Sequence, residues 1–104
     1  MRKADQGDIL KIIGFSWPVL VISNNRFNEI GEVLACPILS EVKPNAVHLP
    51  VHITLVSGDL QGIVVCEQVK HLDLNIRRFT KLGSMRLRDL MDISDTMTAL
   101  FECI

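Results

Sequence analysis

Apolar and polar residues alternate along this chain in short blocks that predict several β-strands followed by one helix. The apolar runs cover residues 9–13, 19–22, 33–39 and 62–66, and each is bounded by residues that favour turns. Residues 46–54 instead alternate between apolar and polar side chains, which is typical of a half-buried strand. An unbroken apolar run such as 19–22 predicts a strand that is buried on both faces.

The stretch from Pro18 to Ser40 organises the rest of the pattern. It holds two of the apolar runs around a polar turn, Ser23-Asn24-Asn25, and residues 26–29 are expected to form one helical turn. Pro37 has no N–H to donate to a neighbouring strand, so it predicts a sheet edge or a bulge at the end of its run. If the protein has a working surface, we expect it where the ends of these runs meet.

The C-terminal residues have a helical period. Apolar side chains recur at steps of three and four, and acidic residues occupy the opposite face. The apolar positions are Leu87, Leu90, Met91, Met97, Leu100, Phe101 and Ile104. Short strands followed by one amphipathic helix predict an α+β fold in which the helix caps a small, strongly bent sheet. With no repeat or linker, residues 1–104 are expected to form one domain.

Charge narrows the choice of partners. A formal net charge of −1 excludes a globally basic nucleic-acid-binding protein. The basic residues are nevertheless concentrated between positions 70 and 88, at Lys70, Arg77, Arg78, Lys81, Arg86 and Arg88. Such a cluster is either solvated surface or a local patch that follows a phosphate backbone. No apolar run approaches the roughly 20 residues that span a bilayer, and Asp5 and Asp8 argue against a signal peptide, so we expect a cytoplasmic chain with no membrane partner.

Cysteine and histidine give no metal site. The three cysteines, Cys36, Cys66 and Cys103, are widely spaced and support neither a disulfide framework nor a zinc site. On a strand, His48 and His52 share a face but lie about 13 Å apart, at roughly 3.3 Å per residue, which is too far to chelate one ion alone. We therefore expect no metal and no cofactor.

Residues near the run 62–66 carry the candidate chemistry. Glu67, Gln68, Lys70 and His71 follow that run, and Arg77 lies further along. A carboxylate, an imidazole and a guanidinium close together would supply a base, an acid and an anion clamp. The alternative is a polar strand end followed by a solvated helical turn.

Trp17 is the one aromatic residue at the start of an apolar run that could stack on a nucleic-acid base. A tryptophan beside a proline at this position is also typical of a lid on the core.

Taken in order, these segments resemble the MazF/PemK-like toxins of type II toxin–antitoxin systems. The matching residues are Gly7-Asp8-Ile9, the segment 18–25, Asn28, Cys36-Pro37-Ile38 with Ser40, Gly62, Val64, the segment 67–70, Leu72-Asp73-Leu74, Arg77 and the terminal helix. The resemblance covers about residues 6–101. It implies a small SH3-like or CcdB-like β-barrel of five to six strands with a helical cap, found as a homodimer. It also implies a metal-independent endoribonuclease that cuts single-stranded RNA and is covered by a cognate antitoxin.

The chain departs from the family pattern at positions that matter for catalysis. The family usually has Arg directly before the Pro18-Val19-Leu20 run and Thr in its Pro-Ile-Thr-Ser motif, and here these positions are Trp17 and Leu39. The first loop is shortened to Gly14-Phe15-Ser16. Removing one group that stabilises the charge developing on a phosphate typically costs about 2.7–4 kcal/mol. Neither Trp nor Leu replaces a guanidinium or a hydroxyl.

Two hypotheses follow. In the first, the chain is a toxin that acts on RNA with a rearranged or weakened site. Glu67 is then the general base and Arg77 the phosphate clamp, and the RNA contacts are Trp17, Ser40, Gln68, Lys70 and His71. In the second, the chain is a non-catalytic binding protein, either a CcdB-like gyrase poison that uses residues 101–104 or an antitoxin-binding relic.

Overall fold

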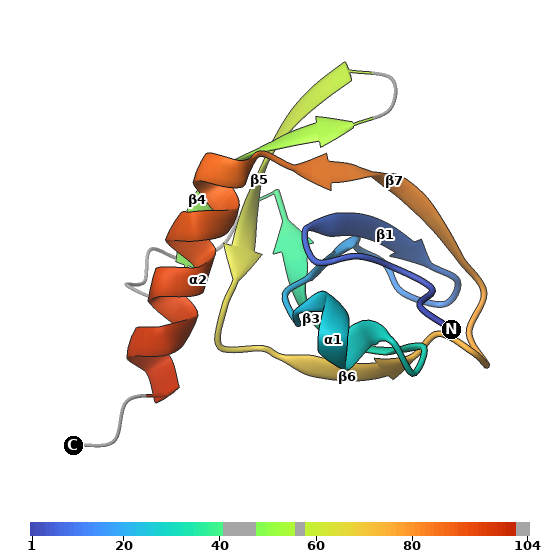
Figure 1. Ribbon diagram of the computed structural model, residues 1–104. Helices are drawn as coiled ribbons and strands as arrows, with labels where there is room; N and C mark the ends of the chain where they lie inside the picture. Colours follow the sequence, from blue (N-terminus) through green and yellow to red (C-terminus); the bar gives the residue numbers. More distant parts are fainter. Residues whose placement is uncertain (41–47, 56–57, 102–104) are drawn as a thin grey trace.

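The computed structural model describes residues 1–40, 48–55 and 58–101, and it describes side chains for residues 1–40 and 61–100. These residues form a curled antiparallel sheet with a helix along one side (Figure 1). In chain order the elements are β1 (Asp8–Ile12), β2 (Val19–Val21), α1 (Asn25–Asn28), β3 (Glu32–Leu39), β4 (His48–Leu55), β5 (Gly58–Val65), β6 (Lys70–Asp73), β7 (Phe79–Met85) and α2 (Leu87–Phe101). The fold is the predicted α+β arrangement of a bent sheet and a terminal helix.

The sheet closes on itself. The strand order is β2-β1-β7-β4-β5-β3-β6, and an additional pairing of β2 with β3 joins the two parts of this series. Six of the seven strands therefore form a ring, and β6 is added to β3 outside it. Closing the ring removes most exposed strand edges, which otherwise pair with other chains. The ring of six lies within the predicted range of strand numbers, and β6 is the seventh.

β3 is central to this sheet because it pairs with three other strands. Residues 35–37 pair with β2, while on the other side residues 32–35 pair with β6 and residues 38–39 with β5. Ile38 donates its N–H to the carbonyl oxygen of Pro18 beside β2 at 2.9 Å. Since N–H groups alternate along a strand, the nitrogen of Pro37 faces the other side, where β6 gives way to β5. The prediction at Pro37 is a sheet edge or a bulge. β3 is not an edge strand, but its pairing is interrupted at residues 36–37 on the side of β6 and β5, and the missing donor of Pro37 is accommodated there.

Alternate residues of the central strands enter two separate cores. One face of β1, β2 and β3 contributes Ile9, Leu20 and Cys36 to a core completed by Val64, Met85 and Ile93. The opposite face contributes Leu10, Val19, Val21, Val33 and Ala35 to a core completed by Leu72 and Leu74. Val19, Leu20 and Val21 are each 0% exposed. The prediction that this run is buried on both faces is confirmed.

The polar turn after β2 caps helix α1 and links it to β3. Asn24 accepts a hydrogen bond from the N–H of Phe27 at 2.9 Å and so caps the predicted helical turn, α1. Asn28 is fully buried, and its amide nitrogen donates to the carbonyl oxygen of Ser23 at 3.0 Å. The hydroxyl of Ser23 in turn bonds the amide oxygen of Asn28 and accepts the N–H of Leu34. These bonds tie α1 to the start of β3, so most of this polar segment serves folding.

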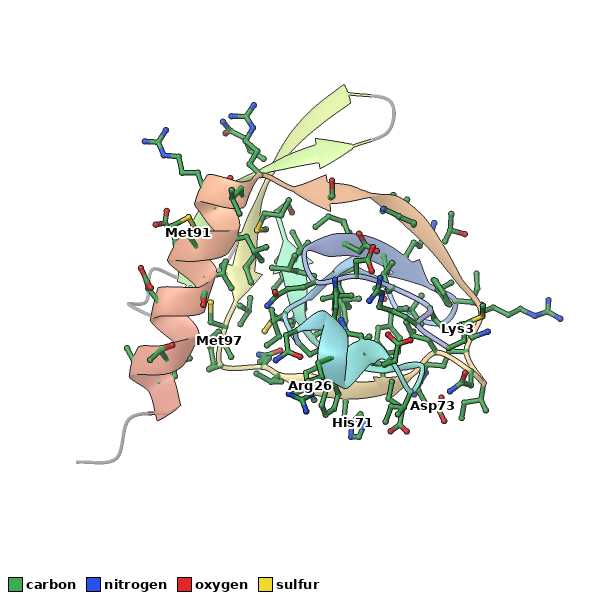
Figure 2. All side chains as sticks on the ribbon, in the orientation of Figure 1. Lys3, Arg26, His71, Asp73, Met91 and Met97 are labelled. Carbon is green, nitrogen blue, oxygen red and sulfur yellow. The ribbon has the colours of Figure 1, made fainter. Side chains whose placement is uncertain are left out.

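Helix α2 packs against the first core along a narrow strip. Ile93 is 1% exposed, and Leu90 and Met97 are half-buried against the same core. Met91, labelled with Met97 in Figure 2, is 60% exposed, and Leu87 is 73% exposed. The predicted amphipathic helix is confirmed, but its buried face is centred on Ile93. Ile104 lies outside the described residues, and the side chain of Phe101 is not described.

The sequence pattern predicts neither β6 nor β7 as a strand, and the helical turn considered after the run 62–66 is instead the strand β6. The β7 segment Phe79–Met85 contains Thr80, Lys81 and Ser84, which are exposed, so no clear alternation is present. The strand pairs with β1 through a register shift between Ile9 and Leu10, which is typical of a β-bulge. It also pairs with β4, and thus it supplies the connection that closes the ring.

Replacing Asn28 by Ala should destabilise the fold. The substitution leaves the buried carbonyl and hydroxyl of Ser23 without their partner, at about 1–3 kcal/mol for each group. The exposed Asn25, which accepts the N–H of Gln6, is a matched control, and Asn25→Ala should cost less than about 1 kcal/mol. Urea denaturation measures both. Equal losses of stability in the two variants would contradict a structural role for the Ser23–Asn28 pair.

Candidate functional site

Two aromatic rings and two cations form a row on one surface of the molecule. The edge of one ring meets the other in the pair Phe15–Trp17, with centroids 5.1 Å apart. The Lys70 ammonium lies 5.5 Å from the Trp17 centroid, and the Arg77 guanidinium lies 5.3 Å from the Phe15 centroid. Cations within about 6 Å of an aromatic face are attracted to it. We call these four residues, Lys70, Trp17, Phe15 and Arg77, the cation–aromatic row.

The local sequence explains how the row is built. Gly14 adopts a positive φ of 97°, which a residue with a side chain rarely does, and Phe15 then donates its N–H to the carbonyl oxygen of Ile12 at 3.1 Å. This tight turn brings Phe15 and Trp17 to the second core, where both are partly buried. Lys70 pairs with Ala35 on β3. The short first loop therefore places two rings beside β6 and its following turn.

A hollow of about 360 Å³ lies next to Trp17. It is formed where the start of β2, the end of β3 and the middle of β5 meet. Its lining residues are Ser16, Trp17, Pro18, Ile38, Leu39, Ser40, Gln61 and Gly62. These include Trp17 and Leu39, the two positions at which the sequence leads us to expect a departure from the family pattern. The described lining carries hydroxyl, amide and apolar groups and no charged side chain.

Glu67 and Gln68 lie at the other end of β6 from Arg77. They occupy the turn after β5, in which Gln68 donates its N–H to the carbonyl oxygen of Val65 at 3.2 Å. Burial raises the pKa of Cys36 to about 12, and the Cys66 thiol and the Glu67 carboxylate add to that rise. Burial, followed by the charge of Glu67, raises the pKa of Cys66 to about 11. Both thiols therefore stay protonated near neutral pH and are poor nucleophiles.

His71 points away from the cation–aromatic row. Successive residues of a strand face opposite sides, and Leu72 is buried in the second core, so His71 faces outward (Figure 2). Its Nε2 lies 2.7 Å from a carboxylate oxygen of Glu32, and its ring lies 6.1 Å from that of Phe27 in α1. The His71–Glu32 pair joins β3 to β6 on the outer surface. His71 and Lys70 therefore do not share a site within one chain.

The structure thus divides the predicted site residues into groups. Trp17, Lys70 and Arg77 share the row, and Ser40 joins Trp17 at the hollow. Glu67 and Gln68 are separated from Arg77 by β6, which alone spans roughly 10 Å. Phe15 is the functional candidate that sequence reasoning missed. The available signal was a second aromatic residue two positions before Trp17 in the same short loop.

Three residues of the basic cluster between residues 70 and 88 have different partners. Lys81 forms an ion pair with Asp8 at 3.1 Å, and the Asp8 side chain is only 8% exposed. Lys70 and Arg77 instead lie against aromatic rings, and Arg77 is exposed. Within this cluster, Lys70 and Arg77 are the two cations that adjoin Trp17 and Phe15.

The described residues hold no metal site. Among the side chains that the structure describes, those of residues 1–40 and 61–100, no three His, Cys, Asp or Glu residues gather as a metal site requires. The side chains of His48 and His52 lie outside the described residues, although β4 does place both on a strand as predicted. Neither helix in the described part of the chain is long and apolar enough to cross a membrane.

Comparison with known proteins identifies the family. Residues 6–101 match the family described as the PemK-like, MazF-like toxin of type II toxin-antitoxin systems. The chain belongs to this toxin family. The matched span includes the cation–aromatic row and all of α2, as the motifs in the sequence predicted.

Individual relatives agree with this assignment. The endoribonuclease toxin ChpB of Escherichia coli (strain K12) is 32% identical over 73 residues, which cover 67% of this chain and 61% of that relative. The crystal structure of MazE-MazF (Form-I) from Deinococcus radiodurans superposes with a TM-score of 0.78 at 24% identity, over 93% of this chain and 94% of that one. An endoribonuclease in complex with its cognate antitoxin from Mycobacterial species has a TM-score of 0.79 at 19% identity, over 97% and 98% of the two chains. These likenesses confirm the fold.

The raised thiol pKa values predict a loss of stability in alkali. Unfolding restores the ordinary pKa of 9.0, so the unfolded chain releases protons that the folded chain keeps. The free energy of unfolding should therefore fall as the pH rises from about 9 towards about 12, with no effect of these thiols below that window. Urea denaturation at about pH 8 and pH 10.5 measures the change, in a Cys103→Ser background that removes the third cysteine.

The control for this prediction is the same background with Cys36→Ala and Cys66→Ala added. Its stability should fall less between the two pH values, because the titrating thiols are gone. An equal fall in both proteins would show that the buried thiols do not contribute. Rapid modification of either thiol in the folded background protein near neutral pH would also contradict their burial.

Proposed function

We propose that this chain is a toxin that acts on single-stranded RNA as a metal-independent endoribonuclease with a weakened, rearranged site. The main supporting observation is the cation–aromatic row, which holds Lys70 and Arg77 in place on one surface. Two fixed cations beside two rings suit a flexible strand that offers both phosphates and exposed bases. Family membership and the similarity to ChpB, an endoribonuclease toxin, support RNA as the substrate.

In this proposal Arg77 clamps a phosphate, and Lys70 with Gln68 and Ser40 contacts the rest of the strand. A guanidinium can hold two phosphate oxygens at once, and its contact with Phe15 limits its motion before RNA arrives. Glu67 is the general base that accepts the proton of the attacking 2′-hydroxyl. His71 would contact RNA only beyond the row, since it faces the outer surface beside Glu32.

The rate of cleavage should be low. Trp17 and Leu39 occupy the positions where the family usually has Arg and Thr, so two groups that act on a phosphate are missing. Each missing group typically lowers the rate by 10²–10³, an effect of about 2.7–4 kcal/mol. Glu67 and Arg77 lie at opposite ends of β6, so within one chain they do not reach the same phosphate.

The proposal includes partners. Two of the similar structures are complexes with an antitoxin, the MazE-MazF complex and the Mycobacterial endoribonuclease with its cognate antitoxin. We therefore propose a cognate antitoxin for this chain, a homodimer as the active form, and action in the cytoplasm. A homodimer would also place the Glu67 of one protomer near the Arg77 of its partner if the two rows face each other.

The second candidate is a non-catalytic binding protein, as in the CcdB-like or antitoxin-binding alternative. The separation of Glu67 from Arg77 and the absence of the usual Arg and Thr favour it. The segment 101–104, which this alternative would use, lies outside the described residues apart from the backbone of Phe101.

An RNA cleavage assay in EDTA tests the proposal. Wild-type protein should cut a long single-stranded RNA slowly, and Glu67→Gln and Arg77→Ala should each lower the rate by about 10²-fold or more. Arg78→Ala and Asp92→Asn are matched controls, because both residues are exposed and outside the row. The controls should keep the wild-type rate within about twofold of its value.

Two results would contradict the proposal. Cleavage that is indifferent to both Glu67→Gln and Arg77→Ala would point to a contaminating nuclease. Growth inhibition by the expressed protein without any RNA decay, retained in both variants, would instead favour the non-catalytic binding protein.

A further inference from the structure

We propose that the hollow beside Trp17 binds one unpaired RNA base, stacked against the indole ring. In this chain a base-binding pocket then stands where the family usually contacts a phosphate. The inference rests on the proposed function insofar as RNA is the ligand, but it concerns binding and not cleavage. It gives the stacking hypothesis for Trp17 a defined pocket, and it adds Leu39 and Gln61 to Trp17 and Ser40 as residues that contact the base.

The chemistry of the lining favours a base over a phosphate. A phosphate needs positive charge or several converging donors, and the described lining has no charged side chain. Trp17, Pro18, Ile38 and Leu39 offer apolar surface, which suits the faces of a planar heterocycle. Indole is a single neutral donor with a large π-face, so it stacks well on a base and neutralises an anion poorly.

Polar groups at the hollow suit the edge of a base. Ser16, Ser40 and Gln61 supply two hydroxyls and one amide from three different segments of the chain. Unpaired RNA bases are recognised by such neutral donors and acceptors on their edges, together with an aromatic ring on their face. Gln61 is exposed on β5, so its amide can adapt to the base that is bound. The hollow measures about 360 Å³, which is enough for one base with some solvent.

The cations next to the hollow are placed for the backbone of the same strand. Lys70 lies over Trp17, and Arg77 follows beyond Phe15. A base in the hollow would therefore leave its flanking phosphates near the cation–aromatic row. This arrangement divides the two tasks: Trp17 binds a base, while Lys70 and Arg77 bind phosphates. The preference for strands that carry bases should then depend on Trp17. The salt dependence of the affinity should depend on Lys70 and Arg77.

Tryptophan fluorescence tests this inference directly. Trp17 is the one tryptophan of the chain, which has no tyrosine, so intrinsic emission reports on this ring. The ligand is a short 2′-O-methyl RNA, which cannot be cleaved because its 2′-oxygens are blocked. An abasic oligonucleotide of the same length and charge is the comparison. The 2′-O-methyl RNA should quench the emission of Trp17 and bind more tightly than the abasic strand. The abasic strand should leave the emission unchanged.

Variants separate stacking from charge. Trp17→Ala should weaken binding of the 2′-O-methyl RNA by about 5- to 150-fold, and Trp17→Phe should restore much of it. Trp17→Ala should keep the dependence of affinity on salt, whereas Lys70→Ala should reduce the slope by about 0.7 for each phosphate that is no longer neutralised. Gln61→Ala changes an exposed side chain and is not expected to disturb folding. It should reduce the difference in affinity among homopolymeric 2′-O-methyl oligonucleotides of different bases.

Several results would overturn the inference. These are no detectable binding, equal binding of RNA and abasic strands, binding without a change in Trp17 emission, or base preference unaffected by Gln61→Ala. If Trp17→Ala does not fold, the fluorescence and Gln61→Ala results decide. Failure here is distinct from failure of the proposed function. Protein that cleaves ordinary RNA without base-dependent quenching refutes the pocket alone, and base-dependent quenching without cleavage refutes the nuclease alone.

Discussion

The structure depends on the position of β3 between two sets of strands. β3 pairs with β2 on one side and with β6 and then β5 on the other, and this arrangement closes the ring. Both faces of the strand are buried, because Ala35 enters one core and Cys36 the other. Pro37 fits here since its missing N–H faces the point where the partner changes. The pairing of Leu39 with Ile63 of β5 therefore positions the end of β3 beside the hollow, and Ser40 follows directly.

The same constraint fixes the chemical character of the site. Trp17 directly precedes Pro18, whose carbonyl oxygen accepts the N–H of Ile38, so its backbone position follows from the β2–β3 pairing. What varies is the side chain placed there. An arginine at this position would bring charge to a phosphate, whereas the indole brings a face for stacking and a partner for Phe15 and Lys70. The fold of the family is retained, and in the proposed function the group that it presents to a ligand is an indole.

Much of the fold follows from the sequence because its signals are local. The unbroken run Val19–Val21, the helical turn after Asn24 and the period of α2 each reflect short-range physics, and each was predicted. β6 and β7 were not, because β6 is a short strand defined by its pairing with β3, and β7 is stabilised by pairing with β1 and β4 and carries few apolar residues. The site was only partly predictable. The pairing of β6 with β3 brings Lys70 to Trp17 and turns His71 away, and Phe15 joins the row through the turn at Gly14.

The most direct test of this account is to restore the usual residues of the family in this scaffold. The double variant Trp17→Arg with Leu39→Thr should raise the rate of RNA cleavage by at least about tenfold, since each group stabilises charge on a phosphate. The same variant should bind the uncleavable 2′-O-methyl RNA with a steeper dependence on salt, because a cation replaces a stacking surface. A folded double variant whose cleavage rate and salt dependence both equal those of the wild type would contradict the account.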